Sequence, residues 1–304
     1  MRPDVPFALL TLLCVAVELP AQPPRRPGAP RLTTAEVRTA EHVYKHTPQG
    51  DLKLHFYLPT DWKPEDKRPA VLFFFGGGWR NGSHLQFVPQ AEYFASRGLV
   101  TACADYRIAS IHKTTPDKCV EDAKSAIRWL RAKASEFGVD AEHIVAAGGS
   151  AGGHLAAATA VLPGFDAPGE NPSVSCKPNA LILFNPALDV PSMAVKDANG
   201  KDVAAQFWPT RVLAKGMPPT IIFFGTNDRL LAGGREYLIK GRSLGNRVEL
   251  YTAAGQPHGF FNRSPWNEVT AREADRFLAS IGYLAGEPTL KIPDGAPALV
   301  RVTE

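Results

Sequence analysis

The residues best suited to do chemistry lie in the segment Gly148-Gly149-Ser150-Ala151-Gly152-Gly153. A serine hydroxyl is a poor nucleophile by itself, and a sharp strand-to-helix turn between glycines lifts its oxygen away from a sheet toward a base. The neighbouring residues favour such a turn, because Ile144–Ala147 is typical of a buried strand and His154–Ala158 of the start of a helix. The pattern therefore predicts nucleophilic catalysis by Ser150.

Two loops further along the chain carry a base and an acid. Asp228 follows the apolar run Thr220–Phe224, and His258 follows the next run, Val248–Thr252. The order serine, acid, histidine is one that recurs on parallel sheets, whose site residues collect in loops at the carboxyl ends of strands. His258 is the only histidine in the sequence after Asp228, so it is the predicted base.

Two other aspartates compete for the role of the acid. Asp189 also follows a strand end, but Asp228 lies directly after the strand that precedes the histidine-bearing one, which is the usual place for the acid. Asp105 stands before the serine and does not fit the order. We interpret it as a structural residue, paired with Arg107 beside the oxyanion site.

A glycine triplet ends an earlier apolar run, Ala70–Phe75. Consecutive glycines allow a backbone path on which successive amide hydrogens converge on one point, as an oxyanion requires. The backbone amides of Gly77, Gly78 and Ala151 are the predicted oxyanion donors.

Aromatic side chains suggest where a substrate pocket would lie. Trp79, Phe207 and Trp208 are candidate substrate-binding walls, and ordinary packing of these rings beneath a loop is the equally open alternative. We interpret His154, four residues after Ser150 on the same helix, as a packing residue rather than a second base.

The elements that must position these residues alternate between strands and helices. Runs such as Val71–Phe75 are apolar on both faces, as expected when helices cover both sides of a parallel sheet. The clearest helix spans Asp117–Phe137, with an apolar stripe at steps of three and four residues. The fold class is α/β, a mostly parallel sheet of about eight strands with helices on both faces. The expected strands are His42–Lys45, Leu52–Leu58, Ala70–Phe75, Leu99–Ala104, Ile144–Gly148, Ala180–Phe184, Thr220–Phe224 and Val248–Thr252.

The amino-terminal residues have the pattern of a targeting segment. Arg2 precedes the apolar stretch Phe7–Val17, and Leu19-Pro20-Ala21 is a plausible processing site, so residues 1–21 are predicted to be a signal peptide. The apolar stretch is too short for a membrane span. Residues 22–40 are predicted to be a Pro-rich linker and residues 41–304 a single catalytic domain, so the mature protein is expected in the periplasm or outside the cell.

Composition excludes several classes of protein. With 304 residues, 44% hydrophobic and 21% charged, the chain is neither disordered nor fibrous. Its net charge of +4 comes from scattered basic residues, which argues against nucleic acid as a partner. Cys103, Cys119 and Cys176 lack metal-ligand spacing and allow at most one disulfide; we expect buried small side chains and no metal. The sequence does not define an oligomeric state.

Five motifs taken together resemble those of a known family. Their order and content are similar to the α/β-hydrolase esterases, over roughly residues 41–285, and within them to the acetyl esterase/lipase group related to hormone-sensitive lipase and to bacterial feruloyl and acetylxylan esterases. The sequence departs from the family at Phe75, where a histidine usually precedes the glycines, which puts the geometry of that loop and the substrate range in question. The motifs are Gly76-Gly77-Gly78-Trp79, Asp105-Tyr106-Arg107, Gly148–Gly153, Gly225-Thr226-Asn227-Asp228 and His258-Gly259-Phe260.

The resemblance implies an α/β-hydrolase fold and a carboxylic ester hydrolase without cofactor. It implies a triad of Ser150, His258 and Asp228, an acyl-enzyme, and small-molecule or polysaccharide-linked ester substrates, with acetyl or feruloyl groups. A peptidase of the prolyl-oligopeptidase type is the first alternative, although 304 residues leave no room for its extra domain. A catalytically inactive binding protein on the same fold is the second.

Overall fold

The computed structural model describes residues 31–303. The predicted signal peptide and residues 22–30 of the predicted linker lie outside the described residues. Residues 31–40 do not form an extended linker as expected. The first strand begins at Arg38, and the side chains of Leu32 and Val37 are buried in the core. Apolar contacts therefore attach residues 32–40 to the domain, which corrects the predicted boundary at residue 41.

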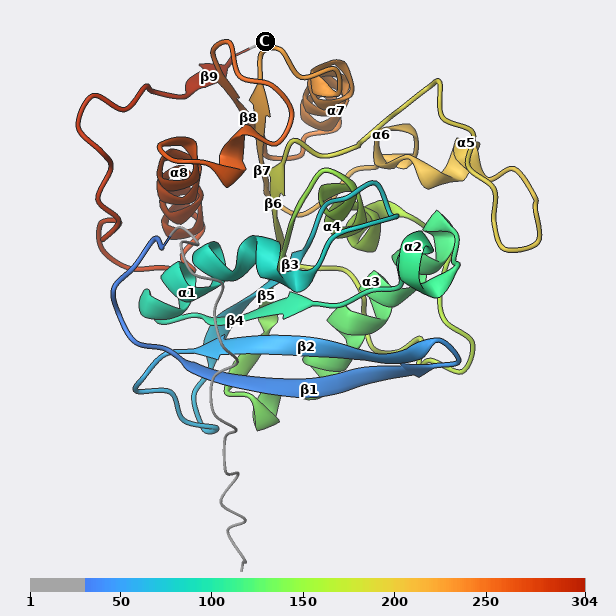
Figure 1. Cartoon of the computed structure of the whole chain (residues 1–304), viewed down its shortest axis with the longest axis horizontal. Helices are drawn as coiled ribbons and strands as arrows, with labels where there is room; N and C mark the ends of the chain where they lie inside the picture. Colours follow the sequence, from blue (N-terminus) through green and yellow to red (C-terminus); the bar gives the residue numbers. More distant parts are fainter. Residues whose placement is uncertain (1–30, 304) are drawn as a thin grey trace, which may run out of the picture.

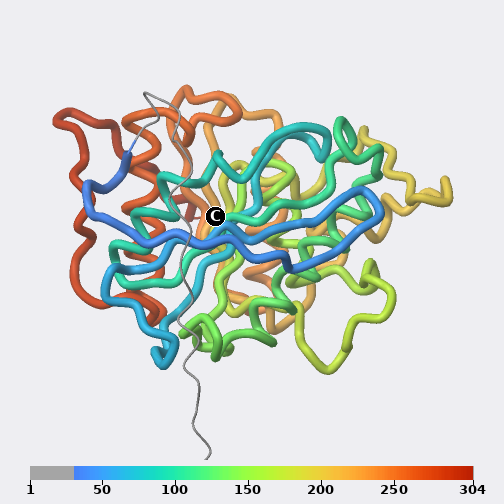
Figure 2. The backbone as a smooth tube through the Cα atoms, turned by 60° about the horizontal axis from the view of Figure 1, so that its bottom comes forward, coloured from blue at the N-terminus to red at the C-terminus, as the bar shows by residue number. Residues whose placement is uncertain are grey.

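A nine-stranded sheet forms the centre of the molecule (Figure 1). The strands are ordered β1-β2-β4-β3-β5-β6-β7-β8-β9, and those from β4 to β8 are parallel to one another, whereas β1, β2 and β9 pair in antiparallel fashion at the two ends of the sheet. The hairpin of β1 and β2 lies along the bottom of the molecule in Figure 1, and in Figure 2, where the bottom has turned forward, it crosses the middle of the view in blue. The strands are β1 Arg38–Thr47, β2 Gly50–Leu58, β3 Arg68–Phe74, β4 Val100–Ala104, β5 Val139–Gly149, β6 Ala180–Phe184, β7 Thr220–Gly225, β8 Val248–Ala253 and β9 Val300–Val302.

Helices cover both faces of this sheet. Helices α3, α4 and α7 pack on one face, and α1 and α8 on the other (Figure 1). Alternate residues of the central strands serve the two cores; in β3, Leu72 and Phe74 face the first core and Val71 and Phe73 the second. The helices are α1 Val88–Ser96, α2 Ala109–His112, α3 Pro116–Ala132, α4 Ala151–Val161, α5 Ala204–Phe207, α6 Pro209–Val212, α7 Leu231–Ser243 and α8 Trp266–Ser280, with 3-10 turns η1 His84–Phe87, η2 Ala134–Glu136 and η3 Phe260–Asn262.

The predicted elements are confirmed with two differences. All eight expected strands are present, and β9 is an additional one that pairs with β8 at the far edge. The helix predicted over residues 117–137 ends at Ala132; the 3-10 turn η2 and Gly138, at φ 59°, then lead the chain into β5.

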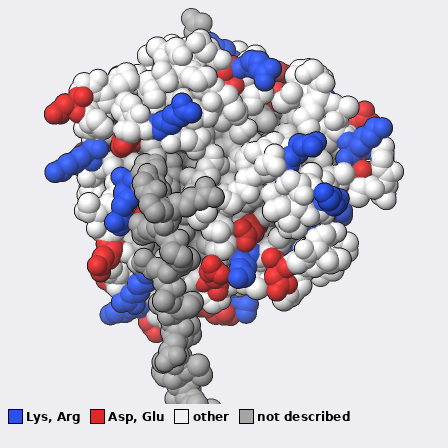
Figure 3. Space-filling model, viewed as in Figure 1, with Lys and Arg blue, Asp and Glu red and all other residues white. Residues whose placement is uncertain are grey.

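Charged side chains of both signs are interspersed on the face of the molecule shown in Figure 3. This distribution agrees with the scattered basic residues of the sequence. Among the described residues 31–303, no helix has the length and apolar character needed to cross a membrane.

Candidate active site

Ser150 lies in a tight turn between β5 and α4, at the middle of the sheet. Its backbone has φ 54° and ψ −117°, a conformation that L-residues rarely adopt, and its amide donates to the carbonyl of Phe184 at 2.9 Å. The turn crosses the end of β3 so closely that a Cβ at Gly152 would lie 2.0 Å from the carbonyl oxygen of Phe74. Glycine is therefore required at 152 for the turn that exposes the serine.

His258 and Asp228 complete a hydrogen-bonded chain with this serine. Nε2 of His258 lies 2.9 Å from Oγ of Ser150, and Nδ1 of His258 lies 2.7 Å from Oδ2 of Asp228. The Asp228 side chain is buried, at 1% exposed, and its other oxygen accepts from the amide of Leu230 at 2.9 Å. A buried carboxylate that accepts both bonds can hold the imidazole in one tautomer with its Nε2 toward the serine.

Asn185, at the end of β6, holds the histidine loop in place. Its Oδ1 accepts from the amide of Gly259 at 3.1 Å, and its Nδ2 lies 3.5 Å from Nε2 of His258. The side chain is fully buried and the backbone has φ 38°. Sequence reasoning missed this residue, although its place after an apolar strand, beside Pro186, was an available signal.

The predicted oxyanion loop lies against the serine turn. A Cβ at Gly76 would lie 3.3 Å from Cβ of Ser150, so the two turns are in contact. Gly77 and Gly78 have φ of 123° and 63°, are exposed, and donate no backbone hydrogen bond to any residue within 31–303. Ala151 is the first residue of α4, where amide hydrogens have no partner within the helix. Gly76, next to two of the predicted donors, thus contacts the serine turn, and the amides of Gly77, Gly78 and Ala151 donate no loop hydrogen bond within residues 31–303.

Two amide side chains connect this loop to the histidine loop. Oε1 of Gln86 accepts from the amide of Gly76 at 2.6 Å, and Nε2 of Gln86 donates to Oδ1 of Asn262 at 3.1 Å. Nδ2 of Asn262 in turn donates to the carbonyl of Gly259 at 3.0 Å. Gln86 and Asn262 were not found from the sequence, because they are 176 residues apart and no local pattern joins them.

Phe75 contributes to the same loop through stacking. Its ring stacks on that of Tyr106 with centroids 4.1 Å apart, and the Tyr106 hydroxyl donates to the Phe75 carbonyl at 2.7 Å. Where the resemblance leads one to expect a histidine, an aromatic pair and the Gln86 side chain hold the loop.

The competing acids have other partners. Asp189 accepts two hydrogen bonds from the guanidinium of Arg211, at 2.8 and 2.9 Å. Asp105 does not pair with Arg107 as predicted, because Arg107 instead binds Asp122 and a second acid on α3. Asp105 lies within hydrogen-bonding distance of two histidines, and although burial opposes ionisation, these histidines hold the pKa of its carboxyl well below the usual range.

The three predicted pocket aromatics surround His154. Phe207 and Trp208 are fully buried, and Trp79 is 5% exposed. The His154 ring stacks on Phe207 at 4.3 Å, and its Nε2 bonds the Phe207 carbonyl at 2.9 Å. Burial lowers the pKa of His154 to about 4. His154 is therefore a neutral packing residue, as interpreted from the sequence, and burial of Phe207 and Trp208 favours packing over a solvent-facing wall.

A cavity of about 570 Å³ opens beside His258. Its lining combines the polar and charged side chains of Ser192, Arg229 and Glu236 with apolar residues such as Pro191 and Leu230. Cys103, Cys119 and Cys176 are free thiols.

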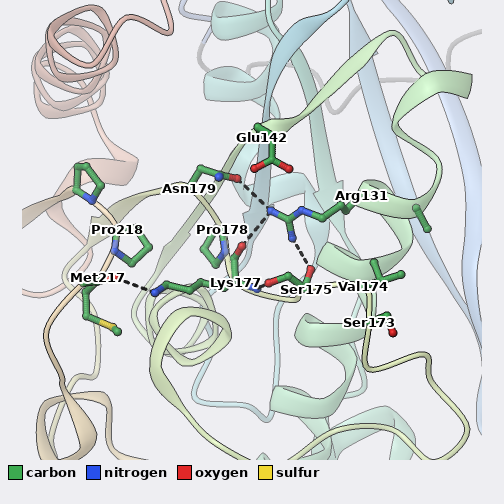
Figure 4. A pocket seen from close by; sticks show the side chains of 13 residues that line it. Arg131, Glu142, Ser173, Val174, Ser175, Lys177, Pro178, Asn179, Met217 and Pro218 are labelled. Atoms are coloured by element: carbon green, nitrogen blue, oxygen red, sulfur yellow. Dashed lines mark hydrogen bonds between the residues drawn. The ribbon is translucent and has the colours of Figure 1, made fainter.

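A second cavity, of about 660 Å³, is remote from this site (Figure 4). Arg131 projects into it from the end of α3 and donates to the carbonyls of Ser175 and Lys177 and to Oδ1 of Asn179. The lining segments precede β5, β6 and β7, whereas Ser150 and Asp228 follow the carboxyl ends of strands. The guanidinium of Arg131 therefore holds the loop before β6 at the amino ends of the strands, away from Ser150.

Known proteins are similar to this chain in sequence and in architecture. Residues 54–194 match the BD-FAE family. Carboxylesterase NlhH of Mycobacterium tuberculosis is 26% identical over 92% of this chain and 96% of its own length. The solved structure of Thermogutta terrifontis esterase 2 is 45% identical, with a TM-score of 0.77, over 85% of this chain and 98% of that one.

Structures of the Thermogutta protein include forms with propionate and with butyrate bound and a form phosphonylated by sarin. These relatives are esterases rather than peptidases or inactive binding proteins. Identity of this extent over nearly the whole of an esterase chain, on a mostly parallel sheet flanked by helices, shows that the chain belongs to the α/β-hydrolase esterases and is a carboxylic ester hydrolase.

Proposed function

We propose that the chain hydrolyses short-chain acyl esters through a Ser150, His258, Asp228 triad and a covalent acyl-enzyme. The observation that carries the proposal is the pair of contacts made by His258, 2.9 Å to Ser150 Oγ and 2.7 Å to Asp228 Oδ2. These are the distances at which a histidine can accept a serine proton while a carboxylate stabilises the resulting imidazolium.

In the first step, Ser150 Oγ attacks the ester carbonyl carbon and its proton passes to Nε2 of His258. The carbonyl oxygen becomes negatively charged, and the amides of Gly77, Gly78 and Ala151 donate to it. When the tetrahedral intermediate collapses, the C–O bond to the alcohol breaks and His258 returns the proton to the leaving oxygen. Asp228 keeps Nδ1 as the donor throughout.

In the second step, water attacks the acyl-enzyme. His258 takes a proton from the water, the same amides stabilise the second oxyanion, and Ser150 leaves as the alcohol after His258 protonates it. The released product is the free carboxylic acid, and no cofactor takes part in either step.

The proposed acyl group is short. Support comes from the Thermogutta esterase, which has been solved with propionate and with butyrate. Within this chain, the buried rings of Phe207 and Trp208 fill space close to the serine helix, which leaves less room for a long chain. An acetyl group suits this arrangement best, and a feruloyl group is the larger alternative.

The proposed alcohol part is polar, such as a carbohydrate. Because His258 protonates the leaving oxygen, the alcohol must lie on the histidine side of the serine. The cavity on that side is lined by Ser192, Arg229 and Glu236, which offer both donors and acceptors to hydroxyl groups. Export of the protein, with removal of residues 1–21 and function in the periplasm or outside the cell, is part of this proposal and rests on the amino-terminal sequence pattern.

The test is hydrolysis of p-nitrophenyl esters from acetate to octanoate by the protein and by its Ser150→Ala variant. We expect the highest kcat/KM at acetate to butyrate and a loss of about a thousandfold or more in the variant, the scale for removing such a nucleophile. Acetylated oligosaccharides, offered in competition, report on the alcohol side. Unchanged hydrolysis by the variant would refute the triad, and a maximum at octanoate would refute the short acyl group.

A further inference from the structure

Two histidines and a carboxylate form a cluster outside the triad. His55 lies on β2, His84 begins η1, and Asp105 follows β4. Nε2 of His55 is 2.9 Å from one Asp105 oxygen, and Nδ1 of His84 is 3.3 Å from the other. The two imidazole rings are stacked with centroids 3.5 Å apart. Three side chains from separate elements therefore direct nitrogen and oxygen atoms to one point.

His55 has more hydrogen-bond acceptors around its ring than a neutral imidazole has hydrogens to donate. Nδ1 lies 3.1 Å from Oε1 of Glu41, while Nε2 faces Asp105, so both ring nitrogens face carboxylate oxygens. A neutral imidazole carries one N–H and can donate to only one of them. Glu41 is also bound by Lys53 at 3.0 Å, which keeps it an acceptor. In a neutral ring the other nitrogen therefore presents its lone pair to a carboxylate oxygen.

A metal ion removes this conflict. Nδ1–H of His55 then donates to Glu41, and the lone pair of Nε2 is free to bind the ion together with Nδ1 of His84 and a carboxylate oxygen of Asp105. A metal-bound histidine whose other nitrogen donates to a carboxylate is the usual arrangement, because the carboxylate fixes the tautomer and the ring orientation.

We propose that His55, His84 and Asp105 bind a divalent transition-metal ion of the zinc type. Two imidazoles and one carboxylate suit such ions better than Ca²⁺ or Mg²⁺, which take mainly oxygen ligands. The ligand atoms lie within 4.8 Å of one another, and metal–ligand bonds of about 2.0 to 2.2 Å require them to approach by roughly 1 Å. The side chains of His84 and Asp105 are 24% and 31% exposed, so they can move and a water can fill the fourth position.

The ion would connect the end of β4 to the oxyanion loop. His84 is two residues before Gln86, whose side chain holds the amide of Gly76. The backbone of Asp105 is also held in place, because the Tyr44 hydroxyl donates to its carbonyl at 2.7 Å. Binding at this site therefore restrains the loop without any metal contact to substrate, and it differs from the esterase mechanism, which needs no metal.

Metal binding is tested on the protein without a polyhistidine tag after treatment with chelator and dialysis. Calorimetric titration with Zn²⁺ is expected to give one equivalent bound with micromolar or tighter affinity, and Co²⁺ is expected to develop visible absorption bands typical of nitrogen and oxygen ligands. Ca²⁺ is expected to give neither signal. Zn²⁺ is also expected to raise Tm by several degrees, because it binds only the folded arrangement.

Three variants make the test specific. His84→Ala, at a partly exposed position, and Asp105→Asn are each expected to weaken Zn²⁺ binding tenfold or more. His46→Ala is the matched control, because His46 also contacts a carboxylate, Asp51 at 2.7 Å, but belongs to an exposed surface pair. Absence of Zn²⁺ binding by the protein, or equal loss in His46→Ala and His84→Ala, would overturn the proposal and leave a hydrogen-bonded histidine pair. These readouts measure binding, so they stand whether or not the proposed triad is correct.

Discussion

Gln86 and Gln90 provide a matched pair that tests how the oxyanion loop is held. Gln86 joins the Gly76 amide to Asn262, whereas Gln90, one helical turn later, joins only Asn267 on α8 through its Nε2 at 2.9 Å. Both glutamines thus donate a hydrogen bond to an asparagine side chain in residues 262–267. Only Gln86 contacts the loop that carries the predicted oxyanion donors.

Replacing each glutamine by leucine separates stability from catalysis. Gln86→Leu leaves the Gly76 amide and Oδ1 of Asn262 without their partner, and an unsatisfied buried group costs about 1 to 3 kcal/mol, so we expect that loss of unfolding free energy. Gln90→Leu leaves Oδ1 of the buried Asn267 without its Gln90 partner and is expected to lower the free energy of unfolding by a similar amount. In catalysis, loss of one oxyanion donor costs about a hundredfold to a thousandfold, so partial displacement of the loop predicts a tenfold to hundredfold lower kcat for Gln86→Leu alone.

The assay is kcat and KM on a p-nitrophenyl ester, with urea unfolding of the same samples. For Gln86→Leu we expect kcat to fall with little change in KM, because the donors act on charge that develops in the transition state. For Gln90→Leu we expect kcat within twofold of the parent protein. Equal kcat values in the two variants at equal stability would show that the glutamine does not position the loop, and the reasoning would fail.

Two further predictions concern single side chains. Asp228→Asn is expected to lower kcat about a thousandfold or more, because the His258 imidazole is no longer held in the tautomer whose Nε2 faces Ser150. For Asp189→Asn we expect kcat within tenfold of the parent protein, because the Asp189 oxygens bind Arg211. The reverse order of the two kcat values would assign the acid to Asp189. For His154, the folded pKa of about 4 lies below the ordinary 6.5, so the unfolded chain takes up a proton first and stability falls as pH drops from 6.5 toward 4. His154→Gln is therefore expected to reduce the stability difference between pH 7.5 and 4.5 by about 2 to 3 kcal/mol, measured by urea unfolding, and an unchanged difference would place the titration elsewhere.

The sheet could be predicted because its signals are local. Each central strand is an apolar run in the sequence, and each of the eight predicted runs overlaps a strand of the structure and extends beyond it by at most one residue. Strand β9 was missed because Val300–Val302 is short and is defined by its antiparallel pairing with β8, which lies about 50 residues earlier in the sequence. The end of α3 was placed too late because apolar spacing continues through Phe137, and only the turn at η2 and Gly138 interrupts the helix.

The segments that carry the proposed triad could be located from glycine turns and strand ends, because backbone geometry forces particular residues there. Side-chain partners that come from distant parts of the fold could not be located in this way. Arg107 was assigned to Asp105, its neighbour in sequence, but the side chain crosses to Asp122 on α3 while Asp105 turns to the histidines. Gln86 escaped notice for the same reason: a glutamine on a surface turn carries no sequence signal of the amide that it will contact.

The bond between Gln86 and Asn262 spans 176 residues and has a consequence for how the enzyme is made. The oxyanion loop leaves the ribosome long before the histidine loop, so the site cannot close until almost the whole chain has been synthesised. Contacts so distant in sequence form late in folding, because a long loop must be closed first. Esterase activity is therefore a property of the finished chain, and its recovery reports the last stage of assembly rather than formation of the sheet.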